Sequence, residues 1–359
     1  MKVDLFDFNL PPELIAQKPA SPRDSAKLLH VTANGLTGQT IRDLPDLLRP
    51  GDLLVVNDTR VIPARLTGKR GDAANPGRPE GGAKIEVTLH KWAADGTWRA
   101  FAKPARKLNA RDYIVFAPGF AADVIQKLDM GEFVLRFNKS GPDLKDALEQ
   151  HGVMPLPPYI KREDAGDDAD RSDYQSLFAQ RDGAVAAPTA SLHFTKPLIN
   201  ALDGRGVERV SLTLHVGAGT FLPVREEDTR HHTMHAEWGE ITEQTADFIN
   251  KVKRAGGRIV ACGSTSMRLL EAAADKDGTI KPFRGETDIF IAPGYRFKAC
   301  DMMLTNFHLP RSTLFMLVAA FAGLDRMRDA YAHAMRSGYR FYSYGDACLL
   351  ERANGDSAG

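Results

Sequence analysis

The sequence is poor in cysteine. Its three cysteines, Cys262, Cys300 and Cys348, lie far apart and form no CxxC pair. Neither a disulfide framework nor a cysteine-based zinc site is therefore expected. Sparse, unpaired cysteine is typical of proteins from a reducing compartment, which leads us to expect a cytoplasmic protein.

Long apolar segments are also lacking. The longest apolar run, Leu314 to Ala322, is far shorter than the roughly 20 residues that a membrane-spanning helix needs. The first residues, MKVDLFDFNLPPEL, carry acids where a secretory signal would need an apolar run. The formal net charge is only +1, so the molecule as a whole gives no electrostatic argument for an anionic partner. We expect a soluble protein without a membrane partner.

The chain has 359 residues, of which 43% are hydrophobic and 26% charged, as in ordinary globular proteins of two or three domains. Between residues 61 and 151, short β-type runs follow one another without helices between them. This predicts a small antiparallel barrel or sandwich, inserted into an α/β body formed by residues 1–60 and 152–350. Arg70 to Ala83 is a glycine- and proline-rich loop of unknown role, and residues 351–359 are expected to form a disordered tail.

Positive charge is concentrated in this insert. Between Arg60 and Arg111 there are twelve basic and four acidic residues, a local excess of +8. A basic β module on a mildly acidic body favours contact with a phosphate backbone. A solvated face that is balanced by acids elsewhere in the fold explains the same pattern equally well.

Polar residues follow a predicted buried strand at Leu53 to Val56. Asn57, Asp58, Thr59 and Arg60 come directly after it. Ligand-binding groups in open α/β sheets occupy this position at the carboxyl end of a strand. The same residue types are also common in simple polar turns, so both interpretations stay open.

Two unusual runs, GAVAAPTASLHFT (183–195) and LTLHVGAGTF (212–221), each place a histidine among small residues. Small residues let a backbone approach a ligand closely, and histidine titrates near neutral pH. The pattern around His193 and His215 therefore favours a site for a flat or anionic small molecule. An ordinary dinucleotide-binding loop is not expected, because Pro223 and a charged run follow the glycines where a helix would have to begin.

Two further segments carry polar groups. The loop Cys262 to Ser266 joins a predicted strand to a predicted helix, so Ser264 to Ser266 form either an anion pocket at a helix N-terminus or a simple helix cap. Arg230 to Glu237 holds three histidines and a carboxylate. A metal site there is disfavoured, because only His231 and His235 have helical spacing and no HExxH pattern is present.

Taken together, these segments resemble the S-adenosylmethionine:tRNA ribosyltransferase-isomerase family of queuosine biosynthesis. The matching runs, in order along almost the whole chain, are FDFNLPPELIAQKP (6–19), VVNDTRVIPARL (55–66), MPLPPYIKR (154–162), GAVAAPTASLHFT (183–195), HVGAGTF (215–221), HTMHAE (232–237) and LTNFHLPRSTLFMLVAAFAG (304–323). One departure is Ser191, which stands where the family pattern has glycine.

The resemblance implies an α/β fold with an open mixed-sheet body and an inserted small antiparallel β-barrel. It also implies a reaction in which S-adenosylmethionine donates its ribosyl part and is consumed. The acceptor is the aminomethyl-deazaguanine base at the wobble position of a tRNA with a GUN-type anticodon. The products are epoxyqueuosine-tRNA, adenine and methionine. No metal is expected, and we expect a monomer.

This chemistry needs groups that move protons, and histidine or a carboxylate suits that task at neutral pH. We expect His193 and His215 to serve first, with Asp58, His308 and Glu237 as second choices. The residues expected to hold S-adenosylmethionine are Arg60, Gly217, Gly219, Thr220, Ser264, Thr265 and Ser266. The residues expected to contact tRNA are Lys103, Arg106, Lys107, Lys161 and Arg162, with Tyr174 stacking on a base.

Two other classes of protein compete with this interpretation. An S-adenosylmethionine-dependent RNA methyltransferase would share the donor but leave S-adenosylhomocysteine. A non-catalytic RNA-binding protein would explain the basic β segment but not the histidine- and glycine-containing loops. A metallohydrolase using His232, His235 and Glu237 is a third, weaker alternative.

Overall fold

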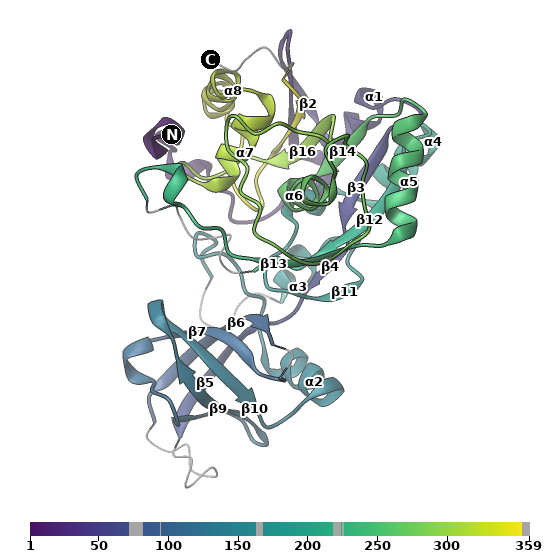
Figure 1. The fold of residues 1–359 in the computed structure, drawn as a ribbon. Helices are drawn as coiled ribbons and strands as arrows, with labels where there is room; N and C mark the ends of the chain where they lie inside the picture. Colours follow the sequence, from purple (N-terminus) through teal and green to yellow (C-terminus); the bar gives the residue numbers. More distant parts are fainter. Residues whose placement is uncertain (72–81, 94, 163–167, 218–223, 225, 354–359) are drawn as a thin grey trace.

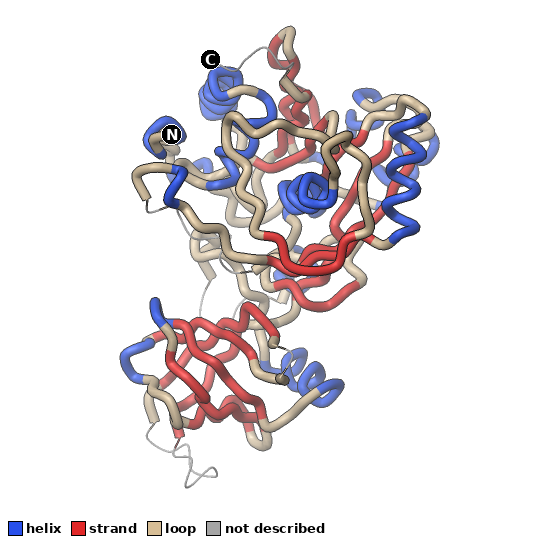
Figure 2. Tube along the Cα trace, viewed as in Figure 1, coloured by secondary structure: helices blue, strands red, loops and turns tan. Residues whose placement is uncertain are grey.

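The computed structural model describes residues 1–71, 82–93, 95–162, 168–217, 224 and 226–353. These residues form an α/β body and a separate β-barrel, which stand apart in Figure 1 and appear as two groups of strands in Figure 2. The body is built on a nine-stranded open sheet in the order β15-β13-β12-β3-β14-β16-β17-β1-β2. The strands, in that order, are β15 (Phe283–Thr287), β13 (Glu237–Ile241), β12 (Glu208–Leu214), β3 (Leu53–Asn57), β14 (Ile259–Cys262), β16 (Met302–Asn306), β17 (Ala347–Glu351), β1 (Lys27–Thr32) and β2 (Gly35–Thr40).

The centre of this sheet is parallel. β12 and β14 both pair in parallel with β3, and β16 pairs in parallel with β14. Every residue of β3 is buried, because Leu53 and Val55 face one apolar cluster while Leu54 and Val56 face another. A parallel strand that is covered on both faces reads as a continuous apolar run, which is why this strand was visible in the sequence.

Helices cover both faces of the sheet. The cluster of Leu53 and Val55 is completed by α5 (Glu243–Arg254), α6 (Gly263–Ala273), α7 (Thr313–Ala322) and α8 (Leu324–Arg336). The opposite cluster is completed by α1 (Leu44–Leu47), α4 (Lys196–Gly204) and the 3₁₀ turn Thr189–His193. No helix in the described part of the chain is long and apolar enough to cross a membrane.

The barrel is closed by six antiparallel strands in the order β10-β7-β6-β5-β8-β9. They are β5 (Arg65–Gly71), β6 (Lys84–Trp92), β7 (Trp98–Lys103), β8 (Tyr113–Ala117), β9 (Phe120–Lys127) and β10 (Glu132–Phe137). Alternate residues such as Ile85, Val87 and Leu89 fill its interior, as the period of two along a strand requires. The expectation of a mixed α/β body with a small antiparallel barrel is confirmed.

Short elements join the barrel to the body. β4 (Thr59–Val61) pairs in parallel with β11 (Arg181–Ala184) just before the barrel begins. After the barrel, α2 (Gly141–His151) leads to Val153, which bridges back to Arg65. Lys91 Nζ lies 2.7 Å from Glu286 Oε1, and Lys145 Nζ lies 2.6 Å from Asp182 Oδ2, so ion pairs also connect the two parts.

The acidic segment 163–173 differs from expectation. Its composition predicts a surface loop over residues 163–173, but Ala169–Asp173 is a short helix, α3. Asp170 of this helix is buried because it accepts hydrogen bonds from the Arg162 guanidinium, with Nε 2.9 Å from Oδ2. Residues 163–167 of that segment, residues 72–81 of the Arg70 to Ala83 loop and residues 354–359 of the tail lie outside the described residues.

Candidate active site

The parallel strands deliver polar side chains to one edge of the sheet. Asp58 follows β3, His215 follows β12, the segment 263–266 follows β14, and Asn306 ends β16. The turn that carries His193 packs against this edge, where Ser191 Oγ lies 3.5 Å from Cys262 Sγ. Ligands of open α/β sheets bind outside the carboxyl ends of the strands, so this edge is the candidate active site.

The imidazole of His215 is held from three sides. Its ring stacks on Trp238 with centroids 5.2 Å apart. On the other side lies Gly183, where an added Cβ would come within 2.8 Å of the ring, so only glycine leaves room. Nδ1 of His215 lies 2.8 Å from Thr59 Oγ1. Burial lowers the pKa of His215 to about 4, and nearby Arg181 adds to this effect. The ring is therefore fixed in orientation and neutral at pH 7.

Asp58 directly follows β3, the strand that pairs with β12. Asp58 is 8% exposed, and its Oδ1 accepts a hydrogen bond of 2.6 Å from Thr213 Oγ1. Burial raises the pKa of Asp58, although the Thr213 hydroxyl and Arg181 act in the opposite direction. Arg181 also forms an ion pair with Glu240 and lies 5.8 Å above the Trp238 ring. A buried carboxyl group with a raised pKa at the same sheet edge as a neutral imidazole is a pattern that recurs at catalytic sites.

His193 lies on the same edge in a drier environment. It is 5% exposed, and burial lowers its pKa to about 4, with Arg340 and Arg23 adding to the effect and Asn306 opposing it. The Asn306 amide therefore lies beside the ring, yet neither His193 Nε2 nor Asn306 Oδ1 makes a hydrogen bond of normal geometry. Asn306 Nδ2 donates to the carbonyl oxygen of Tyr342 at 3.0 Å, which fixes the amide.

More unpaired polar atoms lie at the start of α6. Gly263 turns the chain directly from β14 into the helix with φ of +86°, and no side chain caps the helix. Thr265 Oγ1 and Ser266 Oγ are buried without a hydrogen-bond partner. Buried hydroxyls without partners are rare in folded proteins. Together with free N–H groups and the positive end of the helix dipole, they suit the binding of an anion. Ser264 is half-buried beside them.

Tyr342 is a residue that the sequence did not single out. Its φ of 71° is unusual for a bulky residue, and its N–H donates to the Phe307 carbonyl at 3.0 Å. Its ring packs on Tyr159, with centroids 4.6 Å apart. Backbone strain in a residue of this kind persists where the surroundings hold it firmly, often at functional sites. No local sequence pattern indicates it.

Several expected residues make other contacts. Glu237 is buried in an ion pair with Arg268, and its Oε1 accepts the Gly217 N–H at 3.0 Å. His308 is buried, its Nε2 lies 3.0 Å from Thr305 Oγ1, and burial lowers its pKa to about 3. Arg60 is exposed and lies 3.7 Å from Asp182, on the opposite face of β4 from the buried Thr59. Gly219 and Thr220 lie outside the described residues.

The residues expected to contact tRNA divide into two groups. Lys103, Arg106, Lys107 and Lys161 are exposed. Tyr174, in contrast, is fully buried and packs edge-on against Tyr344, so in this structure its ring has no face on which a base could stack. Arg162 is largely buried by its ion pair with Asp170, so its charge supports α3. The aromatic type of Tyr174 was visible in the sequence, but its burial was not.

The histidine-rich segment 230–237 does not converge on one point. His232 Nδ1 lies 3.2 Å from Glu226 Oε2, whereas Glu237 pairs with Arg268. Among the described residues, no group of three or more His, Cys, Asp or Glu side chains is arranged to hold a metal ion.

The fold and the candidate site define an α/β protein with a candidate ligand site at the carboxyl edge of a mixed sheet and a barrel attached to the body. A family model described as "Queuosine biosynthesis protein" matches residues 3–350. The chain is 60% identical to the S-adenosylmethionine:tRNA ribosyltransferase-isomerase of Beijerinckia indica subsp. indica, covering 98% of this chain and 97% of that one. It is 59% identical to the enzyme of the same name from Rhodospirillum rubrum, covering 98% and 99%.

A solved structure agrees with these relatives. The crystal structure of S-adenosylmethionine tRNA ribosyltransferase from Thermotoga maritima is 32% identical, with a TM-score of 0.53 over 96% of this chain and 99% of that one. The chain therefore belongs to the S-adenosylmethionine:tRNA ribosyltransferase-isomerase family of queuosine biosynthesis. The resemblance noted in the sequence is confirmed.

The lowered pKa values of His193 and His215 predict a specific titration behaviour. The folded protein should bind these protons less readily than the unfolded chain, whose histidines titrate near 6.5. The free energy of unfolding should therefore fall as the pH drops from about 6.5 towards 4. NMR of ¹⁵N-labelled histidine should show both rings neutral at pH 5.5 in the folded protein, while all rings in urea titrate near 6.5. Titration of both folded rings near 6.5 would contradict the prediction.

Proposed function

We propose that this chain transfers and isomerises the ribosyl part of S-adenosylmethionine onto the aminomethyl-deazaguanine base at the wobble position of a tRNA with a GUN-type anticodon. The products are epoxyqueuosine-tRNA, adenine and methionine, and S-adenosylmethionine is consumed as the donor. The proposal rests on family membership. The main structural support is a single edge that carries two neutral imidazoles, His193 and His215, together with Asp58, whose pKa is raised.

The reaction needs a base that is unprotonated when the cationic donor arrives. The sulfonium acidifies the C–H bond of the adjacent ribosyl carbon. A base takes this proton, and the electron pair of the bond stays on the carbon. A pKa near 4 keeps His193 and His215 unprotonated at neutral pH. Because Nδ1 of His215 is engaged by Thr59, its Nε2 is the nitrogen that we assign to proton transfer. Asp58, with a raised pKa, is a stronger base than an ordinary carboxylate, which suits removal of a proton from the incoming ammonium.

The helix start after β14 suits the methionine carboxylate. We assign that group to the N-terminus of α6 with Ser264, Thr265 and Ser266, because two of these hydroxyls are buried and unpaired. Arg60 is a weaker candidate, since it is exposed and faces away from Thr59. The half-buried Gly217 gives its N–H to Glu237, so we assign Glu237 the role of fixing this loop and not that of a base.

The barrel is the proposed tRNA contact. We place residues 61–151 in a tRNA-contact domain, with residues 1–60 and 152–350 as the catalytic body. Its cations Lys103, Arg106 and Lys107 are exposed, and so is Lys161 beyond it. In the strand register, Lys103 of β7 stands opposite Glu86 of β6. This end of the barrel is remote from Lys91, which contacts the body. We propose that a monomer binds the tRNA so that the RNA extends from the sheet edge along the barrel.

The assay that tests this function measures products. The purified chain, incubated with S-adenosylmethionine and a precursor-containing anticodon stem-loop, should release adenine and methionine. His193→Ala and His215→Ala should each lower kcat by about 10²- to 10⁴-fold, because each removes a group assigned to proton transfer. Calorimetry should show S-adenosylmethionine binding within a few-fold of wild type.

The exposed His231 provides a matched control, and His231→Ala should turn over normally. Near-normal turnover in both site variants would remove the base assignment. Release of S-adenosylhomocysteine would instead indicate a methyltransferase, and no turnover by the wild-type chain would indicate an RNA-binding protein.

A second prediction concerns charge on the barrel. Reversal of Lys103, Arg106 and Lys107 to Glu should weaken tRNA binding about 10- to 100-fold at low salt. The slope of log K against log salt concentration should become shallower by about 0.9 for each phosphate that no longer meets a cation. Fluorescence anisotropy over a salt series measures both quantities. The same reversal at Lys251, Arg254 and Lys276, which are exposed on the body, should have little effect. Equal affinity of the two triple variants would place the tRNA on another face.

A further inference from the structure

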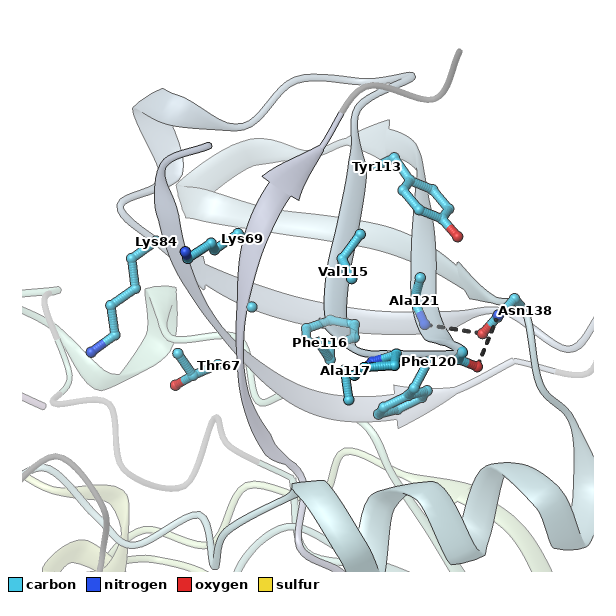
Figure 3. A pocket seen from close by; sticks show the side chains of 13 residues that line it. Thr67, Lys69, Lys84, Tyr113, Val115, Phe116, Ala117, Phe120, Ala121 and Asn138 are labelled. Carbon is cyan, nitrogen blue, oxygen red and sulfur yellow. Dashed lines mark hydrogen bonds between the residues drawn. The ribbon is translucent and has the colours of Figure 1, made fainter. Parts of the chain in front are cut away.

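A groove of about 770 Å³ runs along the flank of the barrel, and none of the site residues discussed above lines it. It lies between β5 and the hairpin of β8 and β9, as Figure 3 shows. Thr67 and Lys69 come from β5, Lys84 from β6, and Tyr113 and Phe116 from β8. Asn138, just after β10, lies on the side of the groove away from Lys84 in Figure 3.

The groove exists because the pairing of two barrel strands stops early. β5 pairs with β8 only where Lys69 to Gly71 meet Val115 to Tyr113. The register of β8 against β9 shifts between Val115 and Ala117, so Phe116 is an extra residue, a β-bulge. Bulges re-aim side chains and locally end strand pairing, and they are common next to functional sites.

Gly68 allows the strands to approach at the floor of the groove. A Cβ at this position would lie 2.7 Å from the Val115 carbonyl oxygen and 2.8 Å from the Phe116 ring. The far wall is fixed by Asn138, whose Oδ1 accepts the Ala121 N–H at 3.0 Å and whose Nδ2 donates to the Gly119 carbonyl at 3.2 Å. The groove is thus a built feature of the barrel surface.

The chemistry of the lining has two parts. Of the described residues that line the groove, the charged ones are Lys69 and Lys84, and none is acidic. Tyr113 and Phe116, both from β8, are half-buried; Figure 3 shows Phe116 nearer to the lysines and Tyr113 farther from them. A cationic border beside aromatic rings is the combination that binds unpaired nucleic acid, because phosphates meet the cations and bases stack on the rings.

Contacts connect the groove residues with the basic end of the barrel and with α2. At the remote end, Arg70, next to Lys69, donates from Nη1 to the Lys107 carbonyl at 3.0 Å, so the groove borders the basic residues of the barrel end. At the other end, the Phe120 ring stacks on His151 of α2 with centroids 5.8 Å apart. Lys145 of the same helix pairs with Asp182, the neighbour of Gly183, on which the His215 ring packs.

We propose that this groove binds unpaired loop nucleotides of the tRNA substrate, with phosphates at Lys69 and Lys84 and a base stacked on Tyr113 or Phe116. The proposal relies on the proposed function only for the identity of the RNA. A duplex suits the groove less well, because its bases are stacked inside the helix and cannot lie on the aromatic rings.

The test compares two groove variants with a control on the opposite side of the barrel. Lys69→Glu removes a cation, Tyr113→Ala removes a ring, and Arg136→Glu makes the same charge change as Lys69→Glu at an exposed position of β10, which pairs with neither β5 nor β8. Binding is measured by fluorescence anisotropy with an anticodon stem-loop hairpin and with a blunt RNA duplex of the same length.

For the hairpin, Lys69→Glu should raise Kd about tenfold. The slope of log K against log salt concentration should become shallower by the contribution of about one phosphate contact. Tyr113→Ala should raise Kd about tenfold at every salt concentration, because stacking is not an ionic contact. Arg136→Glu should bind as wild type, and the duplex should show no loss with Tyr113→Ala. A thermal melt and S-adenosylmethionine binding confirm folding, and Tyr113→Leu replaces Tyr113→Ala if the latter is unstable.

Wild-type hairpin affinity in both groove variants would overturn the proposal, and so would equal losses on hairpin and duplex. A change of oligomeric state in the groove variants, seen by size exclusion without a change in hairpin affinity, would make the groove an interface between copies and also overturn it. If the groove variants lost hairpin affinity but the wild-type chain released no adenine, the groove would still be assigned to RNA binding. That result would reject the proposed function alone.

Discussion

The buried side chain of Asn57 joins the two strands that carry the candidate active site. Its Nδ2 donates to the Leu214 carbonyl at 2.9 Å, and its Oδ1 accepts the N–H groups of Leu214 at 3.0 Å and Thr59 at 3.1 Å. An unpaired amide in this dry position would be costly, so the residue holds both strand ends together. The next residues after these strands are Asp58 and His215. Asn57 therefore helps to position the carboxylate and the imidazole, although it takes no part in the chemistry itself.

Burial from water also shifts the pKa values of the titratable groups at this edge. Burial disfavours charge, so it lowers the pKa of both imidazoles and raises that of Asp58. All three groups are thereby shifted towards their neutral forms. A charged ligand that enters this edge meets the unpaired hydroxyls of Thr265 and Ser266, which can turn towards it. Proton transfer is favoured in such a site because little solvent has to reorganise.

The sequence supported predictions where a pattern of residues has one common structural role. The apolar run at Leu53 to Val56 predicted a buried strand, and short β-type runs predicted the barrel. His193 and His215 were visible because small residues surround them. Contacts between distant parts of the chain were not visible: Asn306 acquires its partner Tyr342 only through the fold, and the burial of Tyr174 results from packing against Tyr344.

Arg60 differs from these cases, because its orientation follows from a simple rule. Successive side chains of a strand point to opposite faces, so a β4 that turns Thr59 inward must turn Arg60 outward. The inward face supplies Thr59 and, from the paired strand, Gly183, which together orient the His215 ring. The outward face supplies Arg60 and Asp182, the latter paired with Lys145 of α2. One pair of short strands thus holds the imidazole on one side and the root of the barrel on the other. The same two strands therefore contact both the imidazole and the helix that follows the barrel.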